Sequence, residues 1–552
     1  MGNRKTEKSN YIVQGSILAI ASIVVRIIGM LYRIPVTNII GDVGNDYYSG
    51  AFEIYNIILL ISSYSLPLAV SKLVAARVKL EQYRNAMRLF RGALLFALVS
   101  GTLGALFTFF CADFLATQVV HTPQSAMALR VLSAAVFILA IMGVIRGYFQ
   151  GLGTMMPTAV SQILEQIINA VVSIAAAGWL FRYGLELDQK AGMVNGTKAA
   201  SYGAAGSTLG TSAGALAALL FLIAVMLLYN RVLQKRLKRD RTRRLMSYSS
   251  LLKTLLLTIL PVILSTAIYN INSVIDQGVF KYLMLEVLKK DSLMVSQQWG
   301  AFTGKYKLLT NVPIAVASAL SASTIPALTA ARISGNRKEM RQETEEAIRM
   351  VMMVCIPSAV GLTALGEPIV QLLFHEGIEL SGKLFLYGSA SVVFYGLSTL
   401  TNGILQGIDQ MRLPVIHAAI ALVSHLLLLL VLVVVGDLDI YAVMAAYMFF
   451  ALMMCVLNAL AIRRHLNYRQ EIRRTFLIPT FASLIMGISI WLLYEFVHEN
   501  LGNTVTLCIC VPLAVLIYAV FILVLQGVTP EELSNLPKGR SLVRLLKKLH
   551  LL

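Results

Sequence analysis

Two arginines lie inside the first long apolar segment of the chain. Arg26 and Arg33 fall within residues 11–40, a run long enough to cross a lipid bilayer. An arginine near the bilayer centre costs about 2.5–3.5 kcal/mol on insertion scales, so it usually faces a protein interior or a watery cavity. Their seven-residue spacing places both side chains on one helix face. The pattern predicts a cationic stripe suited to an anionic ligand such as a phosphate, whose geometry a guanidinium matches.

Acidic residues also lie within or beside apolar segments. Asp46 and Glu53 are seven residues apart at the start of the second segment, and Glu165 and Asp276 lie within the fifth and seventh. We expect these four carboxylates to line or gate the cavity, because ionisable groups inside a membrane usually mark a transport pathway. For Glu165 the alternative is a structural hydrogen bond to a neighbouring helix.

Two lysines in the eighth apolar segment extend the predicted cationic site. Lys305 and Lys307 precede Asn311 and Pro313, and together with Arg26 and Arg33 they are the predicted substrate-binding residues. One alternative is that the lysines mark the outer mouth of their helix. Another is that all these cations pair with the acidic residues as salt bridges, which break and reform as a gate.

Composition assigns the chain to the integral membrane proteins. Hydrophobic residues make up 57% and charged residues 14% of the sequence, with a mean hydropathy of +0.74. The net charge of +19 comes from short basic clusters between apolar runs, which membrane topology explains better than nucleic-acid binding. The five cysteines show no Cys-x-x-Cys spacing and are expected to be free thiols, and the metal content is left open.

The apolar runs predict an all-α polytopic membrane protein. A helix needs about 20 apolar residues to cross the hydrocarbon core. Charged and turn residues divide the chain into fourteen such runs, at 11–40, 47–76, 89–118, 126–149, 156–181, 201–230, 250–282, 300–331, 345–374, 382–406, 413–436, 439–462, 475–497 and 503–526.

Basic clusters give the predicted orientation of these spans. These clusters follow even-numbered spans, at residues 77–88, 231–244, 332–341 and 463–474. The loops that follow odd-numbered spans contain more acidic residues. Because basic loops stay in the cytoplasm, we expect both termini to be cytoplasmic.

An internal repeat divides the predicted spans into two lobes. The segment Gly147–Pro157 reappears as Gly403–Pro414, and Ala75–Arg77 reappears as Ala330–Arg332, at offsets of 255 to 257 residues. Six spans per copy make the repeat parallel, a transporter plan with the substrate site between the halves. The predicted parts are an N-lobe at 1–230, a basic cytoplasmic linker at 231–249, a C-lobe at 250–462, accessory spans at 475–526 and a basic cytoplasmic tail at 527–552.

Several of these features together resemble a known superfamily. They are the six-plus-six-plus-two spans, the segment Arg26–Gly29, the turn Gly41–Asp46 before an aromatic-rich span, and the repeated Gln-Gly-x-x-x-Met motif. The chain resembles the multidrug/oligosaccharidyl-lipid/polysaccharide (MOP) exporter superfamily, and within it the MurJ and SpoVB/YtgP-type lipid II flippases.

The resemblance implies alternating access, a cationic cavity for a pyrophosphate and sugar head group, and a groove for the polyprenyl tail at the last two helices. By position, Arg26 matches a family cavity arginine and Asp46 a functional acidic residue. Arg33 lies one position after the place where the family has its second arginine. In the eighth span, Lys305 or Lys307 takes the place of a family arginine. The resemblance also implies a sodium site near Asp276.

The predicted function is therefore translocation of a polyprenyl-pyrophosphate-linked saccharide, with lipid II, the peptidoglycan precursor, as first choice. The alternatives are a teichoic, capsular or spore-cortex precursor, or cation-coupled drug antiport. A membrane enzyme is disfavoured because no catalytic constellation accompanies a large extramembrane domain. No cofactor is expected, and we expect transport to be coupled to the membrane potential or to a monovalent cation. The expected partners are the lipid-linked substrate, membrane lipids and cell-wall synthesis enzymes.

Overall fold

The computed structural model of the chain is helical throughout its described part. It describes residues 17–18, 20–64, 66–192, 196–240, 242 and 245–527, and within these ranges no β-strand occurs. The basic tail predicted at 527–552, apart from Gly527, and the N-terminal basic residues therefore lie outside the described residues. The predicted all-α fold class is confirmed.

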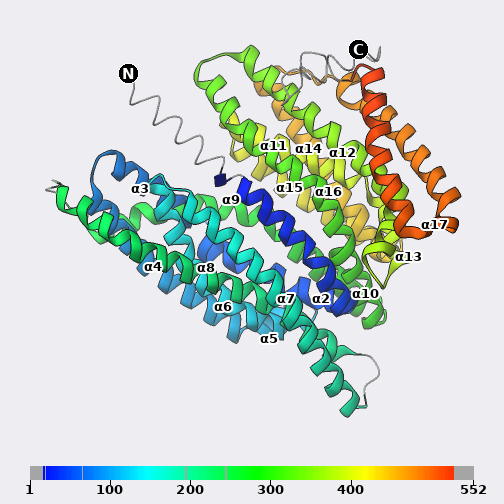
Figure 1. Cartoon of the computed structure of the whole chain (residues 1–552), viewed down its shortest axis with the longest axis horizontal. Coiled ribbons are helices and arrows are strands. Elements are labelled where there is room, and N and C mark those ends of the chain that lie inside the picture. Colours follow the sequence, from blue (N-terminus) through cyan, green and yellow to red (C-terminus); the bar gives the residue numbers. More distant parts are fainter. Residues whose placement is uncertain are drawn as a thin grey trace. The chain divides into compact units, whose positions relative to one another are not determined.

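The helices follow one another with short connections (Figure 1). After a short apolar helix at Ile20–Leu31, the α-helices are α2 (Arg33–Leu59), α3 (Leu66–Lys79), α4 (Tyr83–Phe110), α5 (Ala112–Phe114), α6 (Ser125–Gly151), α7 (Met156–Lys190), α8 (Thr197–Arg239), α9 (Tyr248–Tyr282), α10 (Ser292–Ala301), α11 (Lys307–Ile333), α12 (Arg337–Leu373), α13 (Ile378–Gly388), α14 (Ser391–Gly407), α15 (Arg412–Val434), α16 (Asp439–Leu466) and α17 (Ile478–Val524). Single π-helical turns are η1 (Leu60–Tyr64), η2 (Leu115–Val119), η3 (Leu283–Val287), η4 (Phe302–Tyr306) and η5 (Arg473–Leu477).

Each predicted span contains a helix, but helices and spans do not correspond one to one. Within the described residues, ten helical stretches are long and apolar enough to cross a membrane, or eleven when the bent pair α13 and α14 counts as one span. Glycines with positive φ explain part of the difference. Gly41 (φ 67°) interrupts α2 and Gly502 (φ 75°) interrupts α17, so each of these continuous elements holds parts of two predicted spans.

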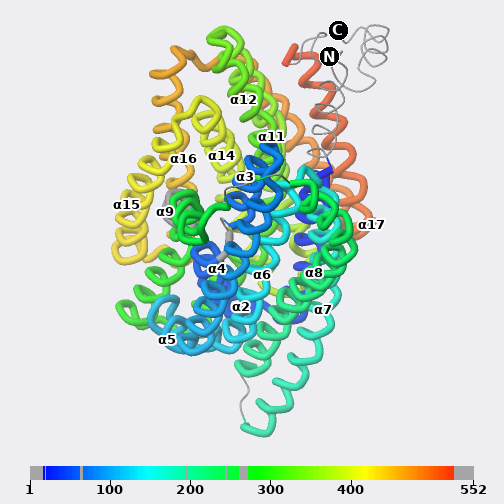
Figure 2. The backbone as a smooth tube through the Cα atoms, turned by 90° about the vertical axis from the view of Figure 1, so that its left-hand side faces the viewer, coloured from blue at the N-terminus to red at the C-terminus, as the bar shows by residue number. Residues whose placement is uncertain are grey.

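Contacts divide the chain into two compact units, Met1–Gly300 and Ala301–Leu552. In the first unit, α7 and α8 run side by side, as Figure 2 shows from a second direction. With 35 and 43 residues they are roughly 50 and 65 Å long, whereas the hydrocarbon core measures about 30 Å. Both helices must therefore extend beyond the hydrocarbon core.

In the second unit, α12 packs against α11, α14 and α17. Core residues Leu365, Ile490 and Leu507 join α12 to both arms of α17 around the break at Gly502. The two predicted accessory spans therefore form one bent helix that leans on α12.

The basic segment predicted as a linker is helical for its first half. Helix α8 continues to Arg239, because lysine and arginine favour helices and stabilise the negative end of the helix dipole. The next residues are tied to α4: the Asp240 carboxylate accepts the Arg84 N–H at 2.6 Å, and Asn85 accepts the Met246 N–H at 3.0 Å. The contact boundary falls later, after Gly300, and the assignment of six spans to each lobe stays a prediction.

The repeated glycine motifs make the same helix contact in each unit. In α6, a Cβ on Gly147 would lie 2.6 Å from the Pro67 carbonyl oxygen, and one on Gly151 would lie 2.7 Å from Val74 Cβ. In α14, the equivalent atoms on Gly403 and Gly407 would lie 1.9 Å from Ser321 Oγ and 3.0 Å from Leu328 Cβ. The glycines allow close helix packing inside each unit, and the matching contacts support the internal duplication.

Candidate functional site

The break at Gly41 starts a new helical stretch that carries Asp46. Gly41 adopts φ 67° and ψ −177°, a conformation that only glycine reaches without strain. The Asn45 side chain donates to the Gly41 carbonyl at 2.9 Å and accepts from the Thr37 hydroxyl at 3.3 Å, which fixes the break on both sides. The side chain of Asp46 follows directly and is fully buried, at 0% exposure.

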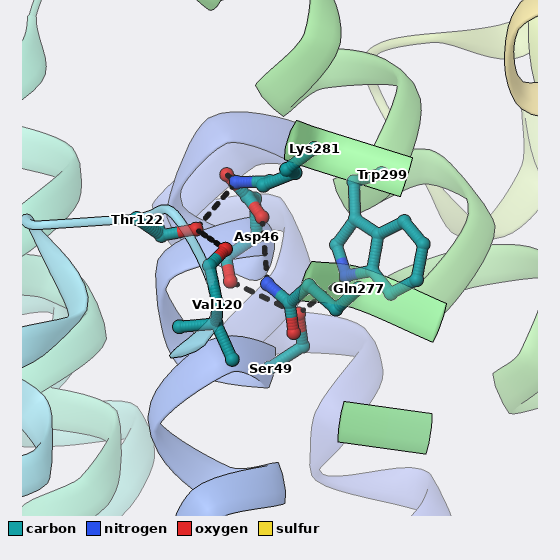
Figure 3. Close-up of polar contacts among 7 residues, drawn as sticks. All are labelled: Asp46, Ser49, Val120, Thr122, Gln277, Lys281 and Trp299. Carbon is teal, nitrogen blue, oxygen red and sulfur yellow. Dashed lines mark hydrogen bonds and ion pairs between the residues drawn. The ribbon is translucent and has the colours of Figure 1, made fainter. Parts of the chain in front are cut away.

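Asp46 forms a buried ion pair with Lys281 at the end of α9 (Figure 3). The Lys281 Nζ lies 2.5 Å from Asp46 Oδ2, and the two side chains are 2% and 0% exposed. Lys281 also donates to the Thr122 hydroxyl at 2.6 Å, and Gln277 donates from its amide to Asp46 Oδ1 at 3.3 Å. Thr122 in turn donates to the Val120 carbonyl at 3.0 Å. Three separate parts of the first unit thus meet at one carboxylate.

Trp299 of α10 closes one side of this cluster (Figure 3). Its indole N–H donates to the Ser49 hydroxyl at 3.2 Å, and that hydroxyl donates to the Asp46 carbonyl oxygen at 2.9 Å. Trp299 is 1% exposed and stacks on Phe280, with ring centroids 5.6 Å apart. We call Asp46, Ser49, Thr122, Gln277, Lys281 and Trp299 the Asp46 cluster.

Glycines let the backbones around the Asp46 cluster approach very closely. A Cβ on Gly278 would lie 2.2 Å from the Val119 carbonyl oxygen, and one on Gly300 would lie 1.7 Å from the Asp42 carbonyl oxygen. Neither position has room for a side chain, because backbone atoms cannot move aside as a flexible side chain can. The end of α9 and α10 are therefore seated directly on the turn around Asp42 and on the turn before α6.

The energetics of the Asp46–Lys281 pair suit a contact that opens and closes. Removing two charges from water costs nearly as much as their attraction returns, so a buried ion pair adds little net stability. Removing one partner alone is different and costs about 3–5 kcal/mol, because it leaves a buried charge uncompensated. The pair can therefore separate only if each charge gains another partner or water.

The two predicted arginines have different surroundings. Arg26 lies on the helix Ile20–Leu31 and is exposed, on the same side as Ile23 and Ile27. The Arg33 guanidinium lies over two aromatic rings of α2, 5.0 Å from the centroid of Tyr48 and 5.7 Å from that of Phe52. Such cation–π contacts contribute about 0.5–2 kcal/mol and hold the guanidinium in place.

The two predicted lysines point in different directions. Lys305 is 1% exposed, and its ammonium donates to the Glu376 carbonyl and lies 5.9 Å from the Phe374 ring centroid. Lys307 is half-buried and lies over Phe302 and Tyr447, at 5.3 and 5.2 Å. Residues two apart lie on opposite sides of a helix, so the two lysines cannot share one cavity wall. Here Lys305 is held inside the second unit, and Lys307 is the accessible one.

The other three predicted carboxylates lie on three different helices: Glu53 on α2, Glu165 on α7 and Asp276 on α9. Glu165 pairs with Arg146 of α6 at 2.8 Å, and Arg146 also donates to Ser161 at 2.9 Å. Glu53 is half-buried on α2, and Asp276 is 2% exposed on α9. Among the described residues, no three His, Cys, Asp or Glu side chains form a group that could hold a metal ion.

The sequence did not single out four residues that contact the predicted carboxylates or their partners: Lys281, Thr122, Trp299 and Arg146. One signal was available for Lys281, because it follows Gln277 by four residues and the two must share a helix face. For Thr122 and Trp299 we find no such signal, since both reach Asp46 only through the packing of distant segments.

Comparisons with known proteins agree with this architecture. Residues 13–332 match the family model described as polysaccharide biosynthesis protein, and residues 308–431 match the MatE model. Over 517 residues the chain is 25% identical to the lipid II flippase MurJ of Bacillus subtilis, covering 90% of this chain and 91% of the relative. It is 24% identical to stage V sporulation protein B of the same organism, covering 97% and 100%.

Solved structures show the same fold. A lipid II flippase MurJ structure in an inward closed conformation superposes with a TM-score of 0.63 at 17% identity, covering 91% of this chain and 97% of that chain. An inward-facing multidrug resistance MATE family transporter gives 0.64 at 16% identity, covering 81% and 98%. The chain thus belongs to the polysaccharide biosynthesis protein family and is a polytopic membrane protein of the MOP superfamily.

Proposed function

We propose that this protein is an alternating-access flippase that moves a polyprenyl-diphosphate-linked saccharide across the bacterial cytoplasmic membrane, with lipid II as the first candidate. It works without covalent chemistry on the lipid. Its relatives are flippases and transporters, and the proposal takes their substrate class from the MurJ relative, which the chain matches over nearly its whole length.

The Asp46–Lys281 pair is the observation that carries the transport mechanism. A buried ion pair adds little to stability, yet here it joins α2, α9 and the turn before α6. We assign it the role of a latch that closes one end of the transport path. Separation of α9 and α10 from α2 opens that end, and the released charges then meet water or substrate.

The latch is assigned to the outer side of the membrane. Asp46 lies near the start of the helical stretch after Gly41, Lys281 lies at the end of α9, and Thr122 lies just before α6. Because the three residues contact one another, these three helix ends lie on the same side of the membrane. The span Arg33–Lys79, which contains Asp46, ends at the basic cluster 77–88, and α9 begins just after the basic cluster 231–244. The positive-inside rule places both clusters in the cytoplasm. The protein with its latch closed thus takes up substrate from the cytoplasmic leaflet.

Phosphate binding is assigned to Arg26 and Arg33 in the first unit, and to Lys307 in the second. Each is at least partly exposed, and aromatic rings hold Arg33 and Lys307 in position. Lys305 is assigned a structural role in the second unit, because its ammonium donates to the Glu376 carbonyl oxygen. Glu165 is assigned a structural role in the first unit, because it forms an ion pair with Arg146. Glu53 and Asp276 remain candidates for gating or for coupling to a monovalent cation or the membrane potential.

A second candidate substrate is a lipid-linked saccharide of sporulation. The relative named stage V sporulation protein B is matched along its entire length at nearly the same identity. Drug antiport is less favoured, because a cation-coupled drug cavity needs acidic rather than basic side chains.

Gene replacement separates the two substrates. The gene is expressed in cells depleted of their own lipid II flippase, and growth and membrane expression are followed. Survival supports lipid II. Failure to grow despite normal expression contradicts lipid II and favours the sporulation precursor.

A further inference from the structure

Lys307 lies at the edge of an aromatic cluster in the second unit. Its ammonium rests over Phe302 and Tyr447, and the Tyr447 ring is stacked on Tyr395, with centroids 4.2 Å apart and planes inclined by 26°. Phe302 meets Tyr447 edge-on at 5.9 Å. Residues from η4, α11, α14 and α16 thus form one continuous cluster.

The exposure of these residues divides them into two layers. Phe302 and Tyr447 are buried, at 1% and 8%, whereas Lys307 and Tyr395 are partly exposed. The buried rings therefore support a cation and an aromatic ring that remain accessible. Helix α14 carries Tyr395, and it is anchored by the close approach of Gly396 to Cys355 of α12, where a Cβ would lie 2.5 Å from the sulfur.

The Lys307 ammonium has unused hydrogen-bonding capacity. In the described part of the chain, its contacts are the two aromatic rings and no carboxylate forms an ion pair with it. A ring face offers a cation only about 0.5–2 kcal/mol, and it satisfies none of the three N–H donors as an oxygen acceptor does. Such a lysine is suited to an anionic group rich in oxygen acceptors.

Beside this cation, Tyr395 and Tyr447 offer a contact suited to a sugar ring. One face of a pyranose ring presents C–H groups, which pack well on the electron-rich face of an aromatic ring. A tyrosine hydroxyl can also exchange hydrogen bonds with sugar hydroxyls. A sugar joined directly to a phosphate would bring both groups to neighbouring parts of the surface.

We propose that Tyr395, supported by Tyr447, contacts the first sugar of a glycosyl diphosphate whose phosphate oxygens bind Lys307. This inference rests on the proposed function and deepens it, because it assigns saccharide recognition to residues that the sequence and the comparisons do not indicate. Lys307 binds any phosphate ester, and the tyrosine pair distinguishes lipids that carry a sugar from those that do not.

Binding measurements on the full-length protein in phosphatidylcholine nanodiscs test the assignment. The probes are undecaprenyl diphosphate and the same lipid carrying a disaccharide. Tyr395→Leu should weaken binding of the sugar-bearing lipid about three- to tenfold and leave the sugar-free lipid unchanged, since one aromatic contact is lost. Lys307→Gln should weaken both lipids alike, and Tyr395→Phe should retain most of the preference.

Tyr387→Leu is the matched control, because Tyr387 is a tyrosine of the same unit that is 61% exposed on α13. Equal loss of both lipids in Tyr395→Leu, or no loss of either, overturns the sugar contact while leaving the flippase proposal standing. Equal displacement of either probe by phosphatidylglycerol also overturns it, since the site would then be a general phosphate site. If the unmodified protein binds neither probe, the flippase proposal fails as well.

Discussion

At the level of single residues, one carboxylate, that of Asp46, gathers several hydrogen-bond donors. The Asp46 carboxylate accepts hydrogen bonds from Lys281 and Gln277 of α9, and the Lys281 ammonium also donates to the Thr122 hydroxyl. Position in the sequence made Asp46 recognisable, since it follows a glycine-rich turn before an apolar run. Its partner lies 235 residues away, and no local pattern in the sequence specifies which distant cation it meets.

Lys281→Met and Asp46→Asn should each slow flipping and lower the melting temperature, because each leaves a buried group without its partner. The double variant should regain stability relative to the singles, since neither charge then remains, yet it should not regain flipping. Thermal unfolding in detergent and a flipping assay measure the two effects separately.

Lys289→Met is the control for this pair. Lys289 also forms an ion pair, with Glu286 at 3.0 Å, but the side chains are 72% and 57% exposed. Exposed pairs contribute about 0–1 kcal/mol, so this variant should behave like the unmodified protein. Normal flipping by Lys281→Met would contradict the latch.

At the scale of helices, the latch depends on backbone approach. Gly300 places α10 against the Asp42 carbonyl with no space for a methyl group. Gly300→Ala should therefore prevent closure and keep the outer end open. Gly361→Ala serves as the control, because no atom lies within 4 Å of its added Cβ.

A cysteine at position 49 reports the closure. Ser49 is 8% exposed in the closed cluster, so Ser49→Cys in a background without the five native cysteines should resist a membrane-impermeant thiol reagent applied from outside. Adding Gly300→Ala should make it reactive. Continued protection together with normal flipping would show that α10 does not close this end.

The attachment of the basic segment to α4 gives a prediction about pH. Burial raises the pKa of Asp240, but hydrogen bonds from the Arg84 backbone N–H and from Thr242 outweigh it and lower the pKa below its usual value near 3.8. The stabilisation is therefore present above pH of about 4 and is lost as the pH falls through the lowered pKa.

Asp240→Ala should remove this cap and speed hydrogen exchange at the Arg84 amide about three- to thirtyfold at neutral pH, as expected for a cap contributing about 0.5–2 kcal/mol. The difference from the unmodified protein should shrink at acidic pH, where Asp240 is protonated in both states. Asp113→Ala, at a 68% exposed side chain, is the control. An unchanged exchange rate in Asp240→Ala would mean that the carboxylate does not hold α4.

Helices were easier to predict than their connections. Apolar length located the spans, and the Gly-x-x-x-Gly motifs indicated packing that the structure places between α6 and α3 and between α14 and α11. Within the segment predicted as a linker, α8 continues to Arg239, because lysine and arginine favour a helix. The sequence left open whether Lys305 or Lys307 faces the cavity, and their two-residue spacing places them on opposite helix faces.

At the scale of the whole molecule, the basic clusters predict the orientation in the membrane. In a background without native cysteines, Lys235→Cys near the end of α8 should react only with reagent on the cytoplasmic side. Lys190→Cys at the end of α7 should react only from outside. Both positions are exposed, so labelling reports sidedness rather than burial. Reaction of either cysteine from the opposite side would reverse the topology and move the latch to the cytoplasmic side.

The proposed flippase moves a lipid-linked saccharide between the two leaflets of the membrane. The most direct test is a leaflet-exposure assay in proteoliposomes that contain the purified protein and a fluorescent polyprenyl diphosphate disaccharide. We expect rapid exposure of inner-leaflet lipid with the unmodified protein, with no change in the lipid's covalent structure. Arg26→Ala should still insert into the membrane but should reduce exposure to the level of empty vesicles. Exposure by the unmodified protein no faster than in protein-free vesicles would contradict the proposed flippase function.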